Sequence, residues 1–351
     1  MVRTFEPTNI HTAKLIDLPL MRRLTERGVL LDSELVCTRE VIGASNVLLS
    51  SILPQRGVYT LVGRAGRQKI VGQFRLRTDL PLAQMIFVAP DADADDSALL
   101  HLLDGVAVEA GKRGAHMLMA EVDEDSALFE TLRIANFAVY ARQTLWRWMG
   151  DPARLPEPTL TLDEITDADI GEINALFASI VPSLIQPVAA PSEDSGGWLY
   201  RRPAVGDDRV RLSAYIAYAK GRGGGYIMPY IAGDVVGAEA ESLLTAALLR
   251  ATAERQSLFV CLRRYQGWLD RALDAVGFMP FKDQAVMVRH IAAGVRHAQF
   301  GLTPMALESL PRAVRPPSRS SVRLRVGVAD MPDGAAPTYA VDLLDESRRN
   351  A

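Results

Sequence analysis

The same pattern of apolar residues occurs twice in this chain, between Ser97 and Met149 and again between Ser242 and His290. Leu99 and Leu243 lie 144 residues apart, whereas Leu132 and Leu273, like the other later pairs, lie 141 apart, so one three-residue deletion aligns the copies. Solenoid repeats recur at roughly 20 to 50 residues, which is much shorter. The repeat therefore predicts two domains of one fold in a single polypeptide.

Each copy is expected to contain a meander of antiparallel strands before its long helix. The first copy has candidate strands at 58–62, 70–76 and 84–88, separated by turn residues. The second has a strand at 159–165, a helix at 170–180 and strands at 210–219 and 226–231. Each copy then continues as helix, strand, short helix, turn and strand. This order indicates an α+β fold with a mixed, mostly antiparallel sheet flanked by helices.

The domain boundaries follow from composition. Three prolines between Gly150 and Pro158 favour an extended linker. We therefore expect an N-terminal domain at residues 1–149, a linker at 150–158 and a C-terminal domain at 159–298. Residues 299–351 are expected to be a mobile tail, because the segment 311–325 holds five arginines and three prolines without an acid.

Charge and cysteine content narrow the class of protein. A net charge of -3 gives no overall reason to expect nucleic acid as a partner. Cys37 and Cys261 lie far apart in the sequence, which favours a reducing compartment. Residues 1–10 have no charged start followed by an apolar run, so no secretory signal is expected, and no uninterrupted apolar run of about 18 residues occurs in the sequence. The sequence predicts a cytoplasmic protein without a membrane partner.

The element order and the Gly277-Phe278 pair before the last strand resemble the GNAT (GCN5-related N-acetyltransferase) family, here as two tandem copies. The resemblance implies acetyl-CoA or another acyl-CoA as cofactor, and an amine on a small molecule or peptide as acceptor. In this fold the diphosphate of CoA needs free backbone N–H groups in the loop before the long helix. The pantetheine arm needs two central strands that separate near Ile231 and Phe259 in the second copy.

The first copy is not expected to bind CoA. The positions that correspond to the family's diphosphate motif are Asp91, Ala94 and Asp96, within a run of four carboxylates in six residues. Those carboxylates would repel a diphosphate.

The second copy is the candidate cofactor site. Its motif positions are Val235, Ala238 and Ala240, and small residues around Gly237 allow close approach of a ligand to the backbone. The family's Gln or Arg is missing, and Glu239 and Glu241 oppose an anion. The predicted cofactor-binding residues are Ile231, Val235, Val236, Gly237, Ala238 and Ala240.

No catalytic residue is predicted. The family often has a tyrosine that protonates the departing thiolate, four residues before the glycine of Gly-Phe. Leu132 and Leu273 occupy that position in the two copies. Tyr265 lies near the start of the following short helix and could reach into the cleft, although a surface or packing role is expected. No residue stands out as a general base.

Other motifs favour structural interpretations. The segment Lys220–Gly225 lacks the Lys-Ser/Thr of a phosphate loop and precedes a strand, so it is expected to be a hairpin turn. The five histidines have no metal-ligand spacing, so no metal site is expected. Cys37 is expected to be a buried thiol, and Trp146 and Trp148 are expected to pack on one face of a strand.

Two functions of different classes are compatible with these residues. The first is an acyl-CoA-dependent N-acyltransferase, in particular an N-acetyltransferase, with its cofactor in the C-terminal domain. The second is a catalytically inactive protein of the same fold that serves as a binding or scaffolding module. The acidic loop at 91–96 and the two leucines favour the second, and the record of the family favours the first.

Overall fold

The computed structural model describes residues 9–14, 17–25, 27–38, 57–65, 68–90, 97–191, 196–203, 210–252 and 257–291. The expected tail at 299–351 and the first copy's loop at 91–96 lie outside these residues. We refer to the described residues up to 149 as the first half and to those from 150 to 291 as the second half. No helix in the described residues is long and apolar enough to cross a membrane.

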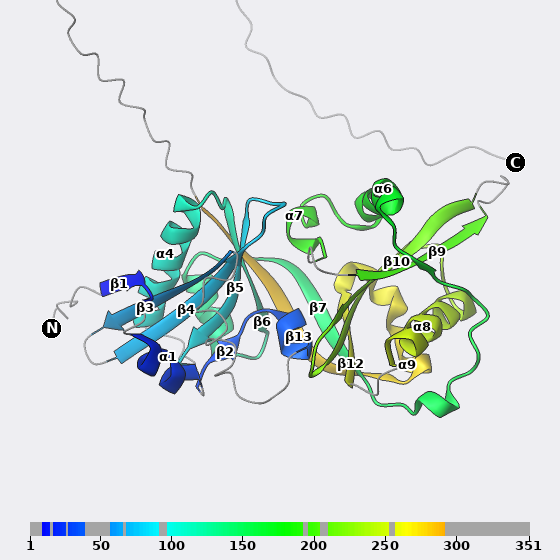
Figure 1. Cartoon of the computed structure of the whole chain (residues 1–351), viewed down its shortest axis with the longest axis horizontal. Helices are drawn as coiled ribbons and strands as arrows, with labels where there is room; N and C mark the ends of the chain where they lie inside the picture. The colour runs from blue at the N-terminus through cyan, green and yellow to red at the C-terminus, as the bar shows by residue number, and fades with distance from the viewer. Residues whose placement is uncertain are drawn as a thin grey trace, which may run out of the picture. The chain divides into compact units, whose positions relative to one another are not determined.

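The first half begins with a strand, two short helices and a meander, followed by a helix, strand, helix and strand (Figure 1). Its strands are β1 (Asn9–Thr12), β2 (Val29–Leu30), β3 (Val58–Ala65), β4 (Gln68–Leu76), β5 (Leu82–Ala89), β6 (Met117–Asp123) and β7 (Ala138–Trp148). Its helices are α1 (Leu18–Thr25), α2 (Ser33–Thr38), α4 (Ser97–Lys112) and α5 (Ala127–Ile134).

The second half repeats this order. Its strands are β8 (Asp163–Glu164), β9 (Gly196–Pro203), β10 (Val210–Lys220), β11 (Gly224–Ile231), β12 (Ser257–Arg263) and β13 (Phe278–His290). Its helices are α6 (Ile170–Ile180), α7 (Gln186–Ala189), α8 (Ala238–Ala251) and α9 (Asp270–Val276), with a 3₁₀ segment, η5, at Arg264–Leu269. The predicted strand at 159–165 is shorter than expected, and the other predicted elements lie within a few residues of the observed ones.

One continuous sheet runs through the described part of both halves. Its strand order is β1-β3-β4-β5-β6-β13-β7-β12-β11-β10-β9-β8, with β2 paired to β5. The last strand of each half is therefore exchanged: β13 lies between β6 and β7, and β7 lies between β13 and β12. Each half completes its sheet with a strand from the other.

The exchange has an approximate two-fold symmetry centred on two glutamines. Gln143 and Gln284 are 141 residues apart, the same separation as Phe137 and Phe278, and they pair with each other in the antiparallel β7–β13 ladder. Gln143 Nε2 donates to Gln284 Oε1 at 3.0 Å. Equivalent residues facing one another across an antiparallel pair are the mark of an isologous interface, here within one chain.

The symmetry also corrects the alignment of the two copies. Glu121 pairs with Val286 and Cys261 pairs with Leu145, which places Glu121 and Cys261, 140 residues apart, at equivalent positions. The single three-residue deletion was therefore too simple, because one further residue separates the strand from the following short helix in the second copy.

The hydrophobic cores confirm the exchange. In the first half α4 and α5 cover one face of the sheet, and that core includes Ala285 and Met287 from β13. In the second half α8 and α9 cover the sheet, and that core includes Trp146 from β7, with Trp148 against it. The prediction that Trp146 and Trp148 pack is confirmed, and the core that they join belongs to the other half.

Separating the two halves is expected to unfold or aggregate them, because β7 and β13 each lose both neighbours from the other half. Expressed alone, residues 1–149 should lack a cooperative thermal transition, whereas a chain cleaved at a protease site placed within the linker 150–158 should remain one complex on a sizing column. A stable, monomeric fragment 1–149 with a sharp transition would contradict the exchange.

Candidate functional site

The two parallel strand pairs separate along their length, as a pantetheine site requires. In the first half β5 and β6 pair only from Leu82–Met117 to Gln84–Met119. In the second half β11 and β12 pair only as far as Ile227–Val260. Beyond these points the backbone groups on the facing edges must find other partners. The expected separation is found near Ile231 but not at Phe259, which still pairs with Tyr226, and a matching separation occurs in the first half.

In the first half the chain's own backbone fills the opening between β5 and β6. Strand β2 pairs with β5, with Val29 beside Val88 and Leu30 beside Phe87. Leu31 then bridges the gap: its N–H donates to Ile86 O at 2.8 Å, and its carbonyl accepts from Glu121 N at 3.0 Å. Leu31 is fully buried. A pantetheine arm would have to displace a hydrogen-bonded segment of the polypeptide.

In the second half a glutamine side chain bonds the edge of β11 beyond its last pairing with β12. Gln266, in η5, accepts from Ile231 N at 3.0 Å through Oε1 and donates to Pro229 O at 2.7 Å through Nε2. Its exposed fraction is 2%. The carboxamide thereby satisfies a donor and an acceptor on the free edge of β11, as an amide of a ligand would.

The predicted cofactor-binding residues lie between the end of β11 and the first turn of α8. Gly237 has φ +58°, in the left-handed region, and a Cβ there would meet no described atom within 4 Å. Ile231, Val235 and Ala240 are buried, and Val236, Gly237 and Ala238 are exposed. Only the exposed three could present backbone to a diphosphate. The structure neither confirms nor contradicts the six as a binding site, so they stay a prediction.

Acidic side chains compete with an anion at this helix start. Glu239 accepts from Arg202 at 3.0 Å and from the Tyr200 hydroxyl at 2.8 Å. Asp234 forms ion pairs with both Arg202 and Arg211. Arg202 and Arg211 are thus neutralised by carboxylates at the helix start, which weakens their attraction for a diphosphate.

The residues at the family's tyrosine position are core residues. Leu132 and Leu273 are fully buried, each in the core of its own half. Tyr265 packs against the cluster that contains Leu199, Tyr215 and Tyr230, as predicted. Burial raises the pKa of its hydroxyl to about 12, and that hydroxyl has no hydrogen-bond partner within the described structure.

A cavity of about 40 Å³ lies where the two halves meet. By volume it has room for about three water molecules. Asp32, Arg75, Gln84 and Glu121 line it from the first half, and the second half contributes apolar surface and Arg263. Because both halves build it, a single copy of the fold would not contain this cavity.

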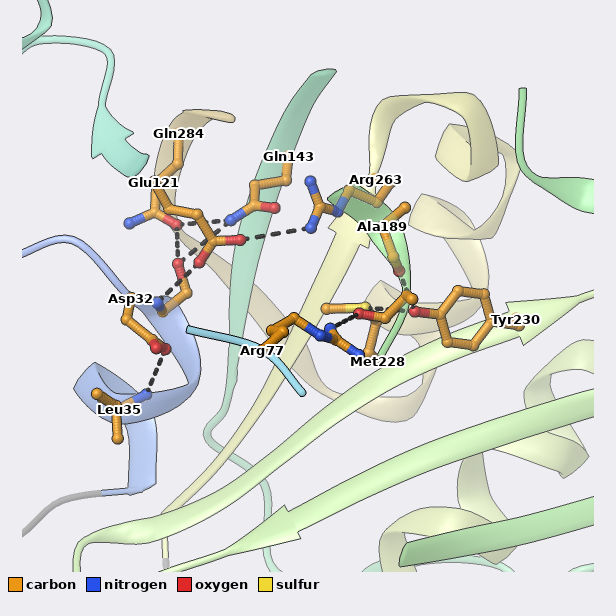
Figure 2. A network of polar contacts seen from close by, with 12 residues as sticks. Asp32, Leu35, Arg77, Glu121, Gln143, Ala189, Met228, Tyr230, Arg263 and Gln284 are labelled. Carbon is orange, nitrogen blue, oxygen red and sulfur yellow. Dashed lines mark hydrogen bonds and ion pairs between the residues drawn. The ribbon is translucent and has the colours of Figure 1, made fainter. Parts of the chain in front are cut away.

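A buried polar network joins the cavity to the glutamine pair at the symmetry centre (Figure 2). Glu121 accepts from Ser33 N at 2.8 Å, and the Ser33 hydroxyl donates to Gln284 Oε1 at 2.7 Å. Gln143 Nε2 approaches the Ser33 hydroxyl at 3.2 Å. Glu121 also forms an ion pair with Arg263 at 3.4 Å, and both side chains are almost completely buried. The network fixes the start of α2 against the exchanged strands.

Asp32 is the most perturbed carboxyl group that lines the cavity. Burial raises the pKa of its carboxyl from 3.8 to about 7, although Arg75 at 3.4 Å acts in the opposite direction. Its Oδ1 accepts from Leu35 N at 3.1 Å and so caps α2.

The two cysteines come together in the fold as free, buried thiols in one cluster with Tyr226. Burial raises the pKa of both, that of Cys261 to about 11. A thiol that stays protonated at neutral pH is a poor nucleophile, which agrees with the structural role expected for Cys37.

Sequence reasoning missed Leu31, Gln266, Glu121 and Arg263. Leu31 and Gln266 gave no local signal, because a leucine after a short strand and a glutamine in a polar turn are ordinary residues. Glu121 and Arg263 did give a local signal in the sequence. Each interrupts or ends an apolar strand, where a charged residue is buried only if it has a partner or a function.

Comparison with known proteins shows the fold. No family model matches the chain, and no curated protein matches it significantly. A solved GCN5-related N-acetyltransferase from Sphaerobacter thermophilus matches over 81% of this chain and 96% of its own length, with a TM-score of 0.52 at 10% identity. A tandem GNAT protein from the clavulanic acid biosynthesis pathway, solved without AcCoA, matches over 81% of this chain and 99% of its own, with a TM-score of 0.50 at 12% identity.

Asp32→Asn is expected to change how stability depends on pH. A carboxyl group whose pKa rises on folding stabilises the folded state at low pH, and this contribution is lost as pH rises from about 4 to about 7. Urea unfolding at pH 5 and pH 8 should therefore show that the free energy of unfolding falls less between the two pH values for Asp32→Asn than for the wild type. The exposed Asp125, changed to Asn, controls for the loss of a charge. Identical pH dependence in wild type and Asp32→Asn would contradict the shift.

Gln266→Ala is expected to lower the free energy of unfolding by at least about 1–3 kcal/mol, because it leaves Ile231 N–H and Pro229 C=O buried without partners. Gln186→Ala is the matched control, since half-buried Gln186 also donates to backbone carbonyls. Urea denaturation of both variants measures the difference. Equal losses would show that the opening is already accessible to water.

Proposed function

Because the chain consists of two GNAT folds in tandem, we propose that it acts as a catalytically inactive binding protein of this fold. The observation that carries the proposal is the filling of both pantetheine openings by the chain itself, by Leu31 in the first half and by Gln266 in the second. The residues present do not fit an acyl-CoA in the described conformation. The acidic side chains at the start of α8 also disfavour binding of the CoA diphosphate.

The cavity between the halves is the place where such a protein would bind a ligand. It combines charged groups from the first half with Arg263 and apolar surface from the second. Ligand sites commonly pair apolar walls with a few polar groups that fix orientation.

A second candidate is an acyl-CoA-dependent N-acyltransferase, in particular an N-acetyltransferase, with its cofactor held by the second half near residues 231–240 and an amine on a small molecule or peptide as acceptor. One observation favours it. The second opening is filled by a side chain, and rotation of Gln266 would free Ile231 N–H and Pro229 C=O for a ligand. The open turn at Gly237 would then lie next to the freed edge.

Acetyl-CoA titration separates the two candidates. The binding-protein proposal expects no thermal shift for the wild type at 1 mM acetyl-CoA, whereas a ligand at 100 times its dissociation constant stabilises a protein by about 2.7 kcal/mol. A shift that Gly237→Asp abolishes and Gly114→Asp preserves would establish the acyltransferase site instead. Gly114 is the matched control because it also has a positive φ and open space around its Cα.

A further inference from the structure

Gln84 is a buried polar side chain whose hydrogen-bonding groups are free within the described part of the chain. Its exposed fraction is 8%, and its Oε1 and Nε2 atoms bond no other described residue. The Oε1 atoms of Gln73 and Gln143 are also unpaired, but they are completely enclosed, whereas the carboxamide of Gln84 is accessible. Buried polar groups in native proteins nearly always have a partner, so a free and accessible one points to a ligand or to water.

Strand β5 directs Gln84 into the cavity between the halves. Ala83 and Met85, its neighbours in the strand, pack in the core beneath α4. Leu82 is on the opposite face of the sheet, where it packs with Val188 of the second half. By the two-residue period of a strand, Gln84 shares the face of Leu82. It accordingly lines the cavity.

The charged groups of the cavity are already engaged. Three carboxyl groups and three guanidinium groups line it, those of Asp32, Glu34 and Glu121 and those of Arg75, Arg77 and Arg263. Asp32 pairs with Arg75, and Glu121 pairs with Arg263. Arg77 pairs with Asp79, and Glu34 is not free either. An ionic ligand would have to break one of these pairs or be buried without a counter-ion, and both are costly.

The size of the cavity and the chemistry of the free carboxamide narrow the ligand further. A cavity of about 40 Å³ admits only a few non-hydrogen atoms. A carboxamide has an acceptor oxygen and an NH₂ group that donates. Another amide placed against it can donate to Oε1 and accept from Nε2 at once, so two parallel hydrogen bonds satisfy both groups. A carboxylate can only accept and an ammonium can only donate, so each would leave one atom of Gln84 without a partner.

We propose that the cavity between the two halves binds the uncharged amide or ureido group of a small molecule, paired with the carboxamide of Gln84. The proposal rests on the proposed function and deepens it by naming the ligand class. Apolar residues of both halves line the same cavity, among them Met119 of the first half and Ala217 and Met228 of the second. Because both halves build the site, a single copy of the fold would not contain it.

Acetamide, acetate and acetamidinium are the matched probes, since they have the same shape and are uncharged, negative and positive respectively. Ligand-observed NMR titration of the full chain at neutral pH is expected to show that acetamide binds at least tenfold more tightly than either ion. Binding of either ion as tight as that of acetamide would overturn the proposal, because the charged lining would then determine the ligand. No binding of acetamide at 50 mM would also overturn it and leave a cavity that holds water only.

Gln84→Met keeps the length of the side chain and removes its donor and acceptor, so it should weaken acetamide binding at least tenfold. The free energy of unfolding should not fall, because the carboxamide has no partner to lose. Gln186→Met, at a residue that does not line the cavity, should leave acetamide binding unchanged. Unchanged binding in Gln84→Met would contradict the assignment.

A second variant keeps the test decisive if Gln84→Met does not fold. Ala219→Leu places a larger side chain in the cavity and leaves the carboxamide intact, and it should abolish acetamide binding. Full binding in this variant would place acetamide outside the cavity and overturn the proposal. If acetyl-CoA and acetamide both bind, the proposed function fails while the amide site stands.

Discussion

The antiparallel pairing of β7 with β13 is the interaction on which the rest of the structure depends. Each strand completes the sheet of the other half, and Gln143 meets Gln284 where the approximate two-fold axis crosses the pair. The apolar side chains of each exchanged strand pack in the core of the other half, so that Met287 lies in the first core and Trp146 in the second. The halves are therefore neither independent domains nor loosely tethered ones, because neither sheet is complete without the other.

This pairing also determines what lies between the halves. It brings β6 and β12 close to the axis, and with them Glu121 and Arg263, which form an ion pair in the interior. A buried ion pair gives little net stability, because desolvation offsets most of the attraction. At the two openings between parallel strands, Leu31 and Gln266 of the chain itself bond the free strand edges.

The sequence predicted the architecture well because the repeat depends on core residues. Leu132 recurs as Leu273 and Phe137 recurs as Phe278, each pair 141 residues apart. Buried positions such as these are where sequence and structure are most tightly linked. The absence of the family's tyrosine also followed directly from the residue type. The strand exchange could not be predicted, because β7 and β13 have the same alternating pattern whichever half they join. Gln266 could not be assigned either, since its role depends on a contact with Pro229 and Ile231 that is far away in sequence.

The central claim is that the edge of β11 is already occupied, and the amide of Ile231 reports on it directly. Hydrogen–deuterium exchange at that amide, followed with and without 1 mM acetyl-CoA, tests the claim most directly. The account predicts strong protection in the free protein, through the bond to Gln266 Oε1, and no change when acetyl-CoA is added. Rapid exchange in the free protein that becomes slow in the presence of acetyl-CoA would contradict it.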